Sequence, residues 1–221
     1  MYVRGWLLIT DIEIYMENIN IRCLSLLNCF FKRCFDISMS FIGLFLTWWV
    51  IILAFFFATF DTRKGGFFTQ IRIGQYGKPF KMIKIRTMRN IRGINTNVTT
   101  LSDPRITKLG FFFRKTKIDE LPQLINVFLG KMSFVGPRPD VSGFADKLKG
   151  DEKIILSIKP GITGPATLKY RHEEELLAKQ TDPEKYNREV LFPDKVRLNR
   201  EYVENYSFWT DMKYIWKTVF K

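Results

Sequence analysis

Two adjacent carboxylates, Asp119 and Glu120, stand in the stretch "RKTKIDELPQL" directly after a strongly basic part of the chain. Residues 62–118 contain fourteen Lys or Arg residues and one acid, Asp103. Cations at this density attract phosphates, nucleic acid or anionic lipid headgroups. A carboxylate beside a bound phosphate can serve as a nucleophile or as a metal ligand. Either the pair is an ordinary charged helix start, or the cations hold an anion on which the pair acts.

The residues after the pair predict a helix. "LPQLINVFLG" has apolar residues at helical spacing, with Pro122 in the first turn and Gly130 as a stop. The pair would then lie at the helix entry, where unpaired N–H groups and the helix dipole would keep Asp119 ionised. Consecutive helical residues point about 100° apart. We therefore expect one carboxylate to face the reacting centre and the other a metal or a phosphate.

Three further segments could bring groups to a phosphate. Alternating apolar and polar residues around "GQYGKP" predict a β-hairpin over residues 67–88, with Lys84 and Arg86 on its strands. In "MSFVGPRPD", two prolines bracket Arg138 and restrict its backbone, which suits bidentate phosphate binding. The glycine-rich "KPGITGP", residues 159–165, could line a nucleotide with its N–H groups.

Several classes of site lack their signatures. The chain has no P-loop, no GxGxxG after a strand and no DxD motif, which argues against ATPase, dinucleotide-dependent and metal-DxD glycosyltransferase sites. Its single histidine, His172, precedes three glutamates and fits a solvated helix face. The three cysteines have no CxxC spacing and indicate neither a zinc site nor a disulfide framework. Any chemistry therefore belongs to carboxylates.

An uncharged run of 24 residues, 37–60, predicts a membrane-embedded helix. At 1.5 Å per residue it would be about 36 Å long, enough to cross a bilayer. Basic residues flank it on both sides, Arg33 before and Lys64 after, which gives no clear orientation. A re-entrant helix, with both ends on one side, resolves this. The C-terminal "SFWTDMKYIWKTVFK" has an aromatic and a basic face, typical of an interfacial helix.

The chain therefore divides into three predicted parts. Residues 1–31 have no assigned structure, residues 32–61 form the membrane anchor, and residues 62–221 form a basic domain with 31 Lys or Arg against 17 acids. The fold class is α+β and mostly helical: a re-entrant anchor helix and a small cytosolic domain that contains a hairpin and interfacial amphipathic helices.

The combination of motifs resembles a known family. "KRCFD", "FFTQIRIG", "KPFKMIKIRTM", "SDPRITKLG", "KIDELPQLINVFLGKMSFVGPRP" and "KPGITG" are similar to the bacterial sugar transferases, the monotopic phosphoglycosyl transferases that act on polyprenyl phosphate. Two positions depart from the family pattern. Thr47-Trp48 replaces the Ser-Pro that breaks the membrane helix, and Pro165 stands where tryptophan is common.

The resemblance implies an enzyme of the bacterial inner membrane, with its catalytic domain on the cytoplasmic face. It would transfer a sugar-1-phosphate from a UDP-sugar to undecaprenyl phosphate and release UMP, the first step of surface glycan assembly. By the same resemblance, Asp119 forms a covalent phosphosugar intermediate and Glu120 serves Mg²⁺. Arg114 and Arg138 would bind the phosphates. The hairpin residues Lys84 and Arg86 complete the predicted substrate-binding set.

Two alternatives remain at this stage. A membrane-tethered protein without catalytic activity could bind nucleic acid or anionic lipid through the basic surface, but it leaves the carboxylate pair without a task. A glycosyltransferase that moves the sugar without its phosphate would release UDP instead of UMP. We expect inner-membrane lipids as partners and no nucleic acid, and the sequence leaves a homodimer open.

Overall fold

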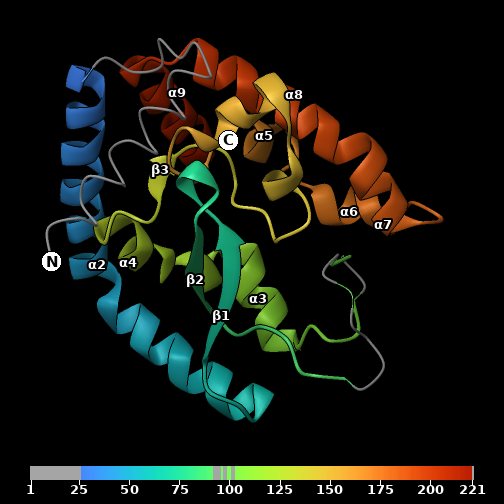
Figure 1. Cartoon of the computed structure of the whole chain (residues 1–221). Coiled ribbons are helices and arrows are strands. Elements are labelled where there is room, and N and C mark those ends of the chain that lie inside the picture. Colours follow the sequence, from blue (N-terminus) through green and yellow to red (C-terminus); the bar gives the residue numbers. More distant parts are fainter. Residues whose placement is uncertain (1–25, 92–95, 97–98, 101–102, 221) are drawn as a thin grey trace, which may run out of the picture.

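The structure, a computed structural model, describes residues 26–91, 96, 99–100 and 103–220 (Figure 1). Most of the predicted N-terminal segment, residues 1–31, lies outside the described residues. The helices are α2 (Leu26–Thr62), α3 (Lys108–Thr116), α4 (Gln123–Phe128), α5 (Pro165–Lys169), α6 (Glu173–Ala178), α7 (Pro183–Tyr186), α8 (Phe192–Glu204) and α9 (Phe208–Val219). The strands are β1 (Phe67–Ile73), β2 (Pro79–Ile85), β3 (Ser133–Val135) and β4 (Gly161–Thr163). The described chain is thus mostly helical, as predicted.

Helix α2 begins six residues before the predicted anchor boundary at residue 32. Figure 1 shows that it changes direction partway: its first part stands beside α4 and α9, and its second part runs along the hairpin and α3. Two hydroxyls bond back to the preceding turn, from Ser40 Oγ to the Asp36 carbonyl at 2.5 Å and from Thr47 Oγ1 to the Gly43 carbonyl at 2.7 Å. Such bonds bend helices without proline.

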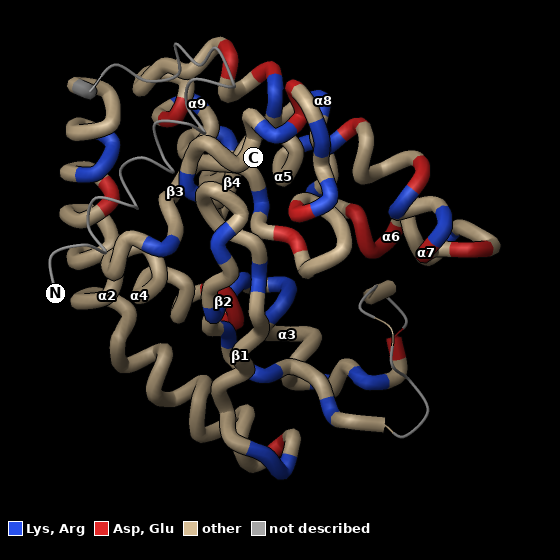
Figure 2. Tube along the Cα trace, in the orientation of Figure 1, with Lys and Arg blue, Asp and Glu red and all other residues tan. Residues whose placement is uncertain are grey.

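The second part of α2 has one face against the protein and one face exposed. Ile51, Ala54 and Ala58 are buried in a cluster with Ile85 of β2 and Phe113 of α3. The other face exposes large apolar residues, among them Phe45, Leu46, Trp48, Trp49, Ile52, Leu53, Phe56, Phe57 and Phe60. Only 17% of the most apolar window is buried, unlike the core helix of a soluble protein. Figure 2 shows this part without charge until its end. The helix is long and apolar enough to cross a membrane.

The predicted hairpin is present. Strands β1 and β2 pair antiparallel, with Phe67 opposite Ile85 and Ile73 opposite Pro79. The connection contains a short 3₁₀ turn in which Tyr76 and Gly77 have φ values of 57° and 71°. Glycine adopts this left-handed region without the cost that a side chain imposes, so the glycine-rich turn suits the reversal.

The second sheet consists of the parallel strands β3 and β4, with Ser133 opposite Gly161 and Val135 opposite Thr163. Val135 belongs to the main apolar core, which is completed by residues of the 3₁₀ segments 145–147 and 150–156 and by α8. Helix α9 covers this sheet from the side. Its inner face buries Asp211, whereas Trp209, Trp216 and Phe220 are exposed. The interfacial role of this helix stays a prediction.

Candidate active site

The carboxylate pair lies in a tight turn between α3 and α4. Thr107 caps the N-terminus of helix α3, and its Oγ1 accepts a hydrogen bond from the Gly110 N–H at 2.8 Å. The helix ends at Lys117, which has a left-handed φ of 60° and reverses the chain. A 3₁₀ turn, Ile118–Glu120, follows directly and contains both acids. The pair therefore lies on a separate 3₁₀ turn directly before α4, at the entry to that helix.

Asp119 is buried, with 5% of its surface exposed, and its Oδ1 has no hydrogen-bond partner among the described residues. Burial raises the pKa of its carboxyl above the ordinary value, and the neighbouring charge of Glu120 raises it further. Lys84, Arg114 and Lys117 oppose this effect without cancelling it. The shift is therefore opposite in direction to the lowering of the pKa that a helix dipole would cause. Loss of water outweighs the favourable charges.

Glu120 has the opposite electrostatic character. Its Oε1 accepts hydrogen bonds from Lys84 Nζ at 3.1 Å and from Arg138 Nη2 at 2.9 Å. Burial alone would raise the pKa of this carboxyl, but Lys84, Arg138 and Lys117 together hold it well below its usual value. The two neighbouring acids thus differ: Glu120 is an ion fixed by two cations, and Asp119 is a buried carboxyl with a free oxygen. Such a division is typical of carboxylate pairs with separate roles.

Arg138 reaches Glu120 from a loop whose backbone is bonded on several sides. The Gly161 N–H donates to the Pro137 carbonyl at 2.8 Å, and Arg72 Nη1 donates to the Pro139 carbonyl at 3.1 Å. The loop also passes very close to β4, because a Cβ on Gly161 would lie 2.1 Å from the backbone nitrogen of Gly136. The guanidinium itself is half exposed, with 44% of the side chain accessible. A fixed backbone with an accessible guanidinium suits phosphate binding.

The same contacts change the interpretation of "KPGITGP". We predicted a loop that lines a nucleotide, but Gly161–Thr163 form strand β4, which packs against β3. The Gly161 N–H is already used to hold the Arg138 loop, and so is the Thr163 carbonyl, which accepts from the Gly136 N–H at 2.9 Å. The glycines of this segment permit a close approach of two backbones.

The structure places the other two predicted phosphate ligands differently. Arg114, in the last turn of α3, is close enough to Asp119 to lower its pKa, and it forms an ion pair with Glu174 at the start of α6. Arg86 donates to the carbonyls of Gly65 and Phe67, at 2.8 and 3.0 Å. These bonds fix the connection between α2 and β1. The phosphate-binding role of Arg86 stays a prediction.

A second polar cluster lies next to Arg138 and was not predicted. Burial raises the pKa of Asp140 to about 6. The charges of Lys195 in α8 and Arg72 in β1 lower this pKa, and that of Glu173 in α6 raises it. Lys195 Nζ also donates to Glu173 Oε1 at 2.6 Å. Asp140 directly follows "GPRP", which is a local signal. Glu173 and Lys195 come from distant helices, and no sequence pattern joins them to the site.

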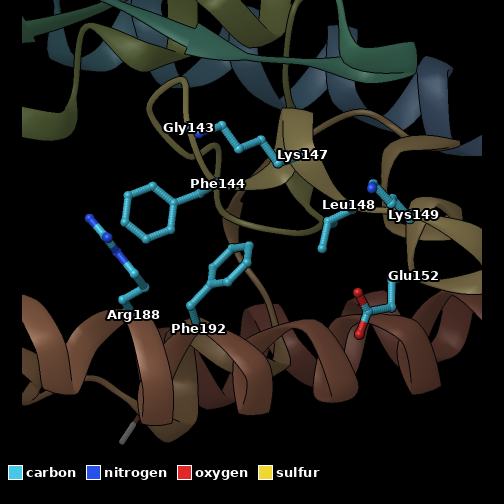
Figure 3. Close-up of a pocket in the computed structure, with 8 residues that line it drawn as sticks. All are labelled: Gly143, Phe144, Lys147, Leu148, Lys149, Glu152, Arg188 and Phe192. Carbon is cyan, nitrogen blue, oxygen red and sulfur yellow. The ribbon is translucent and has the colours of Figure 1, made fainter.

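A hollow of about 330 Å³ lies between the segment after this cluster and α8 (Figure 3). It is lined by Gly143, Phe144, Lys147, Leu148, Lys149, Glu152, Arg188 and Phe192. The rings of Phe144 and Phe192 pack edge to face, with their centroids 5.1 Å apart, and Arg188 lies beside them. In the described part of the chain, no hydrogen bond or ion pair joins these lining residues to Asp119 or Glu120. We assign this hollow no part in the chemistry of the pair.

The carboxylate pair is also the candidate binding site for the predicted Mg²⁺. No group of three or more His, Cys, Asp or Glu side chains that could hold a metal occurs in the described ranges. Mg²⁺ does not need such a group, since one or two carboxylates and the substrate phosphates usually bind it. Glu120 Oε1 is occupied by two cations, but no described side chain donates to its other oxygen. The second oxygen of Glu120 is therefore available to a metal that arrives with a phosphate-bearing substrate.

Comparison with known proteins gives a consistent result. The model of a family described as bacterial sugar transferase matches residues 27–221. The chain is 36% identical to a UDP-glucose:undecaprenyl-phosphate glucose-1-phosphate transferase of Klebsiella pneumoniae, over 88% of this chain and 40% of that protein. It is 33% identical to an undecaprenyl-phosphate galactose phosphotransferase of Salmonella typhimurium, over 86% of this chain and 40% of that protein. An uncharacterized sugar transferase of Bacillus subtilis, EpsL, is 35% identical over 86% of both chains.

The chain thus spans about two fifths of the length of several relatives and most of the length of another. The matched region includes the carboxylate pair, the Arg138 loop and nearly all of α2. The chain belongs to the bacterial sugar transferase family.

Proposed function

We propose that this protein transfers a sugar-1-phosphate from a UDP-sugar to undecaprenyl phosphate through a covalent intermediate on Asp119. The observation that carries the proposal is the contrast within the pair: a buried carboxyl with an unpartnered oxygen beside an ion held by Lys84 and Arg138. The names of two relatives, from Klebsiella pneumoniae and Salmonella typhimurium, describe transfer of a sugar phosphate to undecaprenyl phosphate.

In the first half-reaction, an oxygen of the Asp119 carboxylate attacks the β-phosphorus of the donor. The bond between that phosphorus and the bridging oxygen breaks, and UMP leaves with the electron pair. In the second, a phosphate oxygen of the polyprenyl phosphate attacks the phosphorus of the phosphosugar-aspartate. This step forms the lipid diphosphate sugar and regenerates the carboxylate. Carboxylates are established nucleophiles in phosphoryl transfer.

The surrounding residues explain why Asp119, and not Glu120, is the nucleophile. A carboxylate that accepts bonds from two cations is stabilised and is a weaker nucleophile, whereas the free oxygen of Asp119 is desolvated. Arg138 and Lys84 then counter the negative charge of the diphosphate. Glu120 would hold Mg²⁺, which supplies charge neutralisation to the phosphates when bound. This arrangement gives the carboxylate pair a task that binding of nucleic acid does not.

The packing of α2 supports a re-entrant anchor. Its first part contacts β3 and α9, and its second part contacts β2 and α3 of the same body. Residues inside the hydrocarbon of a spanning helix could not pack against a body on one side of the bilayer. We therefore place both ends of α2 on the cytoplasmic face of the inner membrane, with the exposed apolar face of α2 and the aromatic residues of α9 in lipid. A homodimer stays a prediction.

The product separates the candidate functions. Purified protein in lipid nanodiscs should release UMP from a UDP-sugar, with Mg²⁺ and undecaprenyl phosphate present, and should form a lipid-linked sugar diphosphate. A panel of UDP-sugars would identify the sugar. Release of UDP would favour a glycosyltransferase and overturn the proposal. Salt-sensitive binding of nucleic acid, with no product from any donor, would favour the non-enzymatic alternative.

A further inference from the structure

Two charged residues of the membrane helix are buried in the body of the protein. Lys32 is 8% exposed and Asp36 is 2% exposed, one turn apart near the start of α2. Charged groups are seldom buried without partners, because the loss of water is costly. Each of them forms at least one hydrogen bond to the same short element, strand β3. Neither is needed for a helix that serves as a membrane anchor alone.

Asp36 holds the first half of the strand. Its Oδ1 accepts hydrogen bonds from Ser133 Oγ at 3.1 Å and from the Phe134 N–H at 3.0 Å. Ser133 is completely buried. Both bonds go to the same carboxylate oxygen, so a carbonyl oxygen at this place could accept them equally well.

Lys32 holds the end of the strand. Its Nζ donates to the Val135 carbonyl at 2.9 Å and forms an ion pair with Asp211 of α9. Asp211 also accepts from the hydroxyls of Tyr202 and Tyr206, at 2.6 and 3.2 Å. Burial and the charge of Asp211 raise the pKa of both tyrosines, so both hydroxyls stay protonated and keep donating. The Asp211 carboxylate thus neutralises the charge of Lys32, and the Lys32 ammonium group also donates to the Val135 carbonyl.

Strand β3 leads straight into the active site. Val135 is three residues before Arg138, and the only residues between them are Gly136 and Pro137. Proline has a fixed φ and removes backbone freedom from this connection. A displacement of β3 is therefore passed to the Arg138 backbone with little loss. A shift of about 1 Å at a catalytic group can cost about 100-fold in rate.

We propose that Asp36 and Lys32 are positioning residues that place Arg138 at the reacting phosphate by fixing strand β3 to the membrane helix. The inference rests on the proposed function. It makes the start of α2 part of the active-site scaffold as well as an anchor. The geometry of the donor site is then set by the same helix that fixes the protein in the membrane.

A set of variants in full-length protein in nanodiscs tests this, with exchange of labelled UMP into UDP-sugar as the readout. Asp36→Leu removes the acceptor of both bonds, and we expect a 10- to 100-fold loss of kcat, as for a misplaced catalytic group. Asp36→Asn keeps a carbonyl oxygen at that place and should restore the rate to within about threefold of wild type. Ser133→Ala removes one bond without adding bulk and should show a smaller loss. If Asp36→Leu does not fold, Ser133→Ala alone tests the link between Asp36 and strand β3.

Repeating the variants in an Arg138→Gln background distinguishes positioning of Arg138 by Asp36 from a general structural role of Asp36. If Asp36 acts through Arg138, then Asp36→Leu and Ser133→Ala should lower the rate less than twofold once the guanidinium is absent. Arg33→Gln is the matched control, since Arg33 fastens the same part of α2 to the carbonyls of Val127 and Phe128. Its effect should be the same in both backgrounds.

Equal fold-losses for Asp36→Leu and Ser133→Ala with and without Arg138 would overturn the inference, and so would failure of Asp36→Asn to restore the rate. Both results leave the proposed function intact as long as the wild-type protein exchanges UMP. Absence of exchange in the wild type would instead contradict the proposed function itself.

Discussion

Glu120→Gln should destabilise the protein, whereas the similar change Asp119→Asn should not. Glu120 is an ion with 12% of its side chain exposed and with two cationic partners, and glutamine would leave Lys84 without its counter-charge. Removing one partner of a fully buried pair costs about 3–5 kcal/mol. Lys84 is 17% exposed and Arg138 is 44% exposed, so water offsets part of this cost. We expect a loss of about 2–3 kcal/mol, at or below the lower limit of that range.

The change should be visible in thermal unfolding. For a chain of this size, 1 kcal/mol corresponds to about 2–4 °C, so Tm should fall by about 4–12 °C at pH 7. The pKa of Glu120 is depressed in the folded state, so its contribution is present above pH 4.5 and is lost as the pH falls through the folded pKa. The difference between wild type and Glu120→Gln should therefore shrink in acid.

Asp119→Asn supplies the matched comparison with the opposite sign. The pKa of Asp119 is raised in the folded state, so its ionised form costs stability once the pH exceeds the ordinary value of 3.8. The asparagine variant should be at least as stable as wild type at pH 7, and any gain should vanish in acid. Tryptophan fluorescence during heating, at pH 7 and pH 3, measures both variants. A Tm loss for Asp119→Asn as large as that for Glu120→Gln would refute the division of roles within the pair.

Three other outcomes follow from the site and the anchor. Arg138→Lys keeps the positive charge but loses the planar guanidinium that binds phosphate through two hydrogen bonds, so kcat for sugar-phosphate transfer should fall at least tenfold with an unchanged Tm. Wild-type turnover by this variant would show that Arg138 contributes only its charge. Gly161→Ala would place a Cβ 2.1 Å from the Gly136 nitrogen, which should displace the Arg138 loop and lower both activity and Tm; a fully active variant would contradict this packing. Single cysteines at Arg33 and Lys64, in a background without native cysteines, should both be protected from an impermeant thiol reagent in intact cells and both react after the membrane is opened. Labelling of one of them in intact cells would indicate a spanning helix.

The sequence predicts the local features of this fold well. Alternation around "GQYGKP" indicates the hairpin, and the uncharged run indicates the long apolar helix, because both depend on residues close in the chain. The stop at Gly130 is confirmed by its φ of 74°. Strands β3 and β4 were not predicted, since three residues are too short for a pattern and their pairing is long-range.

The site was predicted only in part, for a similar reason. Asp119, Glu120 and Arg138 lie in recognisable motifs, and the structure places Lys84 with them at Glu120. The raised pKa of Asp119 depends on burial by the whole fold, which local reasoning about a helix dipole does not include. The cluster around Asp140 likewise depends on helices that follow much later in the chain.

The central claim is that Asp119 forms the covalent bond, and the first half-reaction tests it most directly because that step needs no lipid acceptor. Protein, Mg²⁺, UDP-sugar and labelled UMP are incubated without polyprenyl phosphate, and label is followed into UDP-sugar. We predict exchange by the wild type, none by Asp119→Asn, and weakened exchange by Glu120→Gln that recovers partly at high Mg²⁺. A direct displacement predicts no exchange in any variant without the lipid. Exchange by Asp119→Asn at the wild-type rate would contradict the covalent role of this residue.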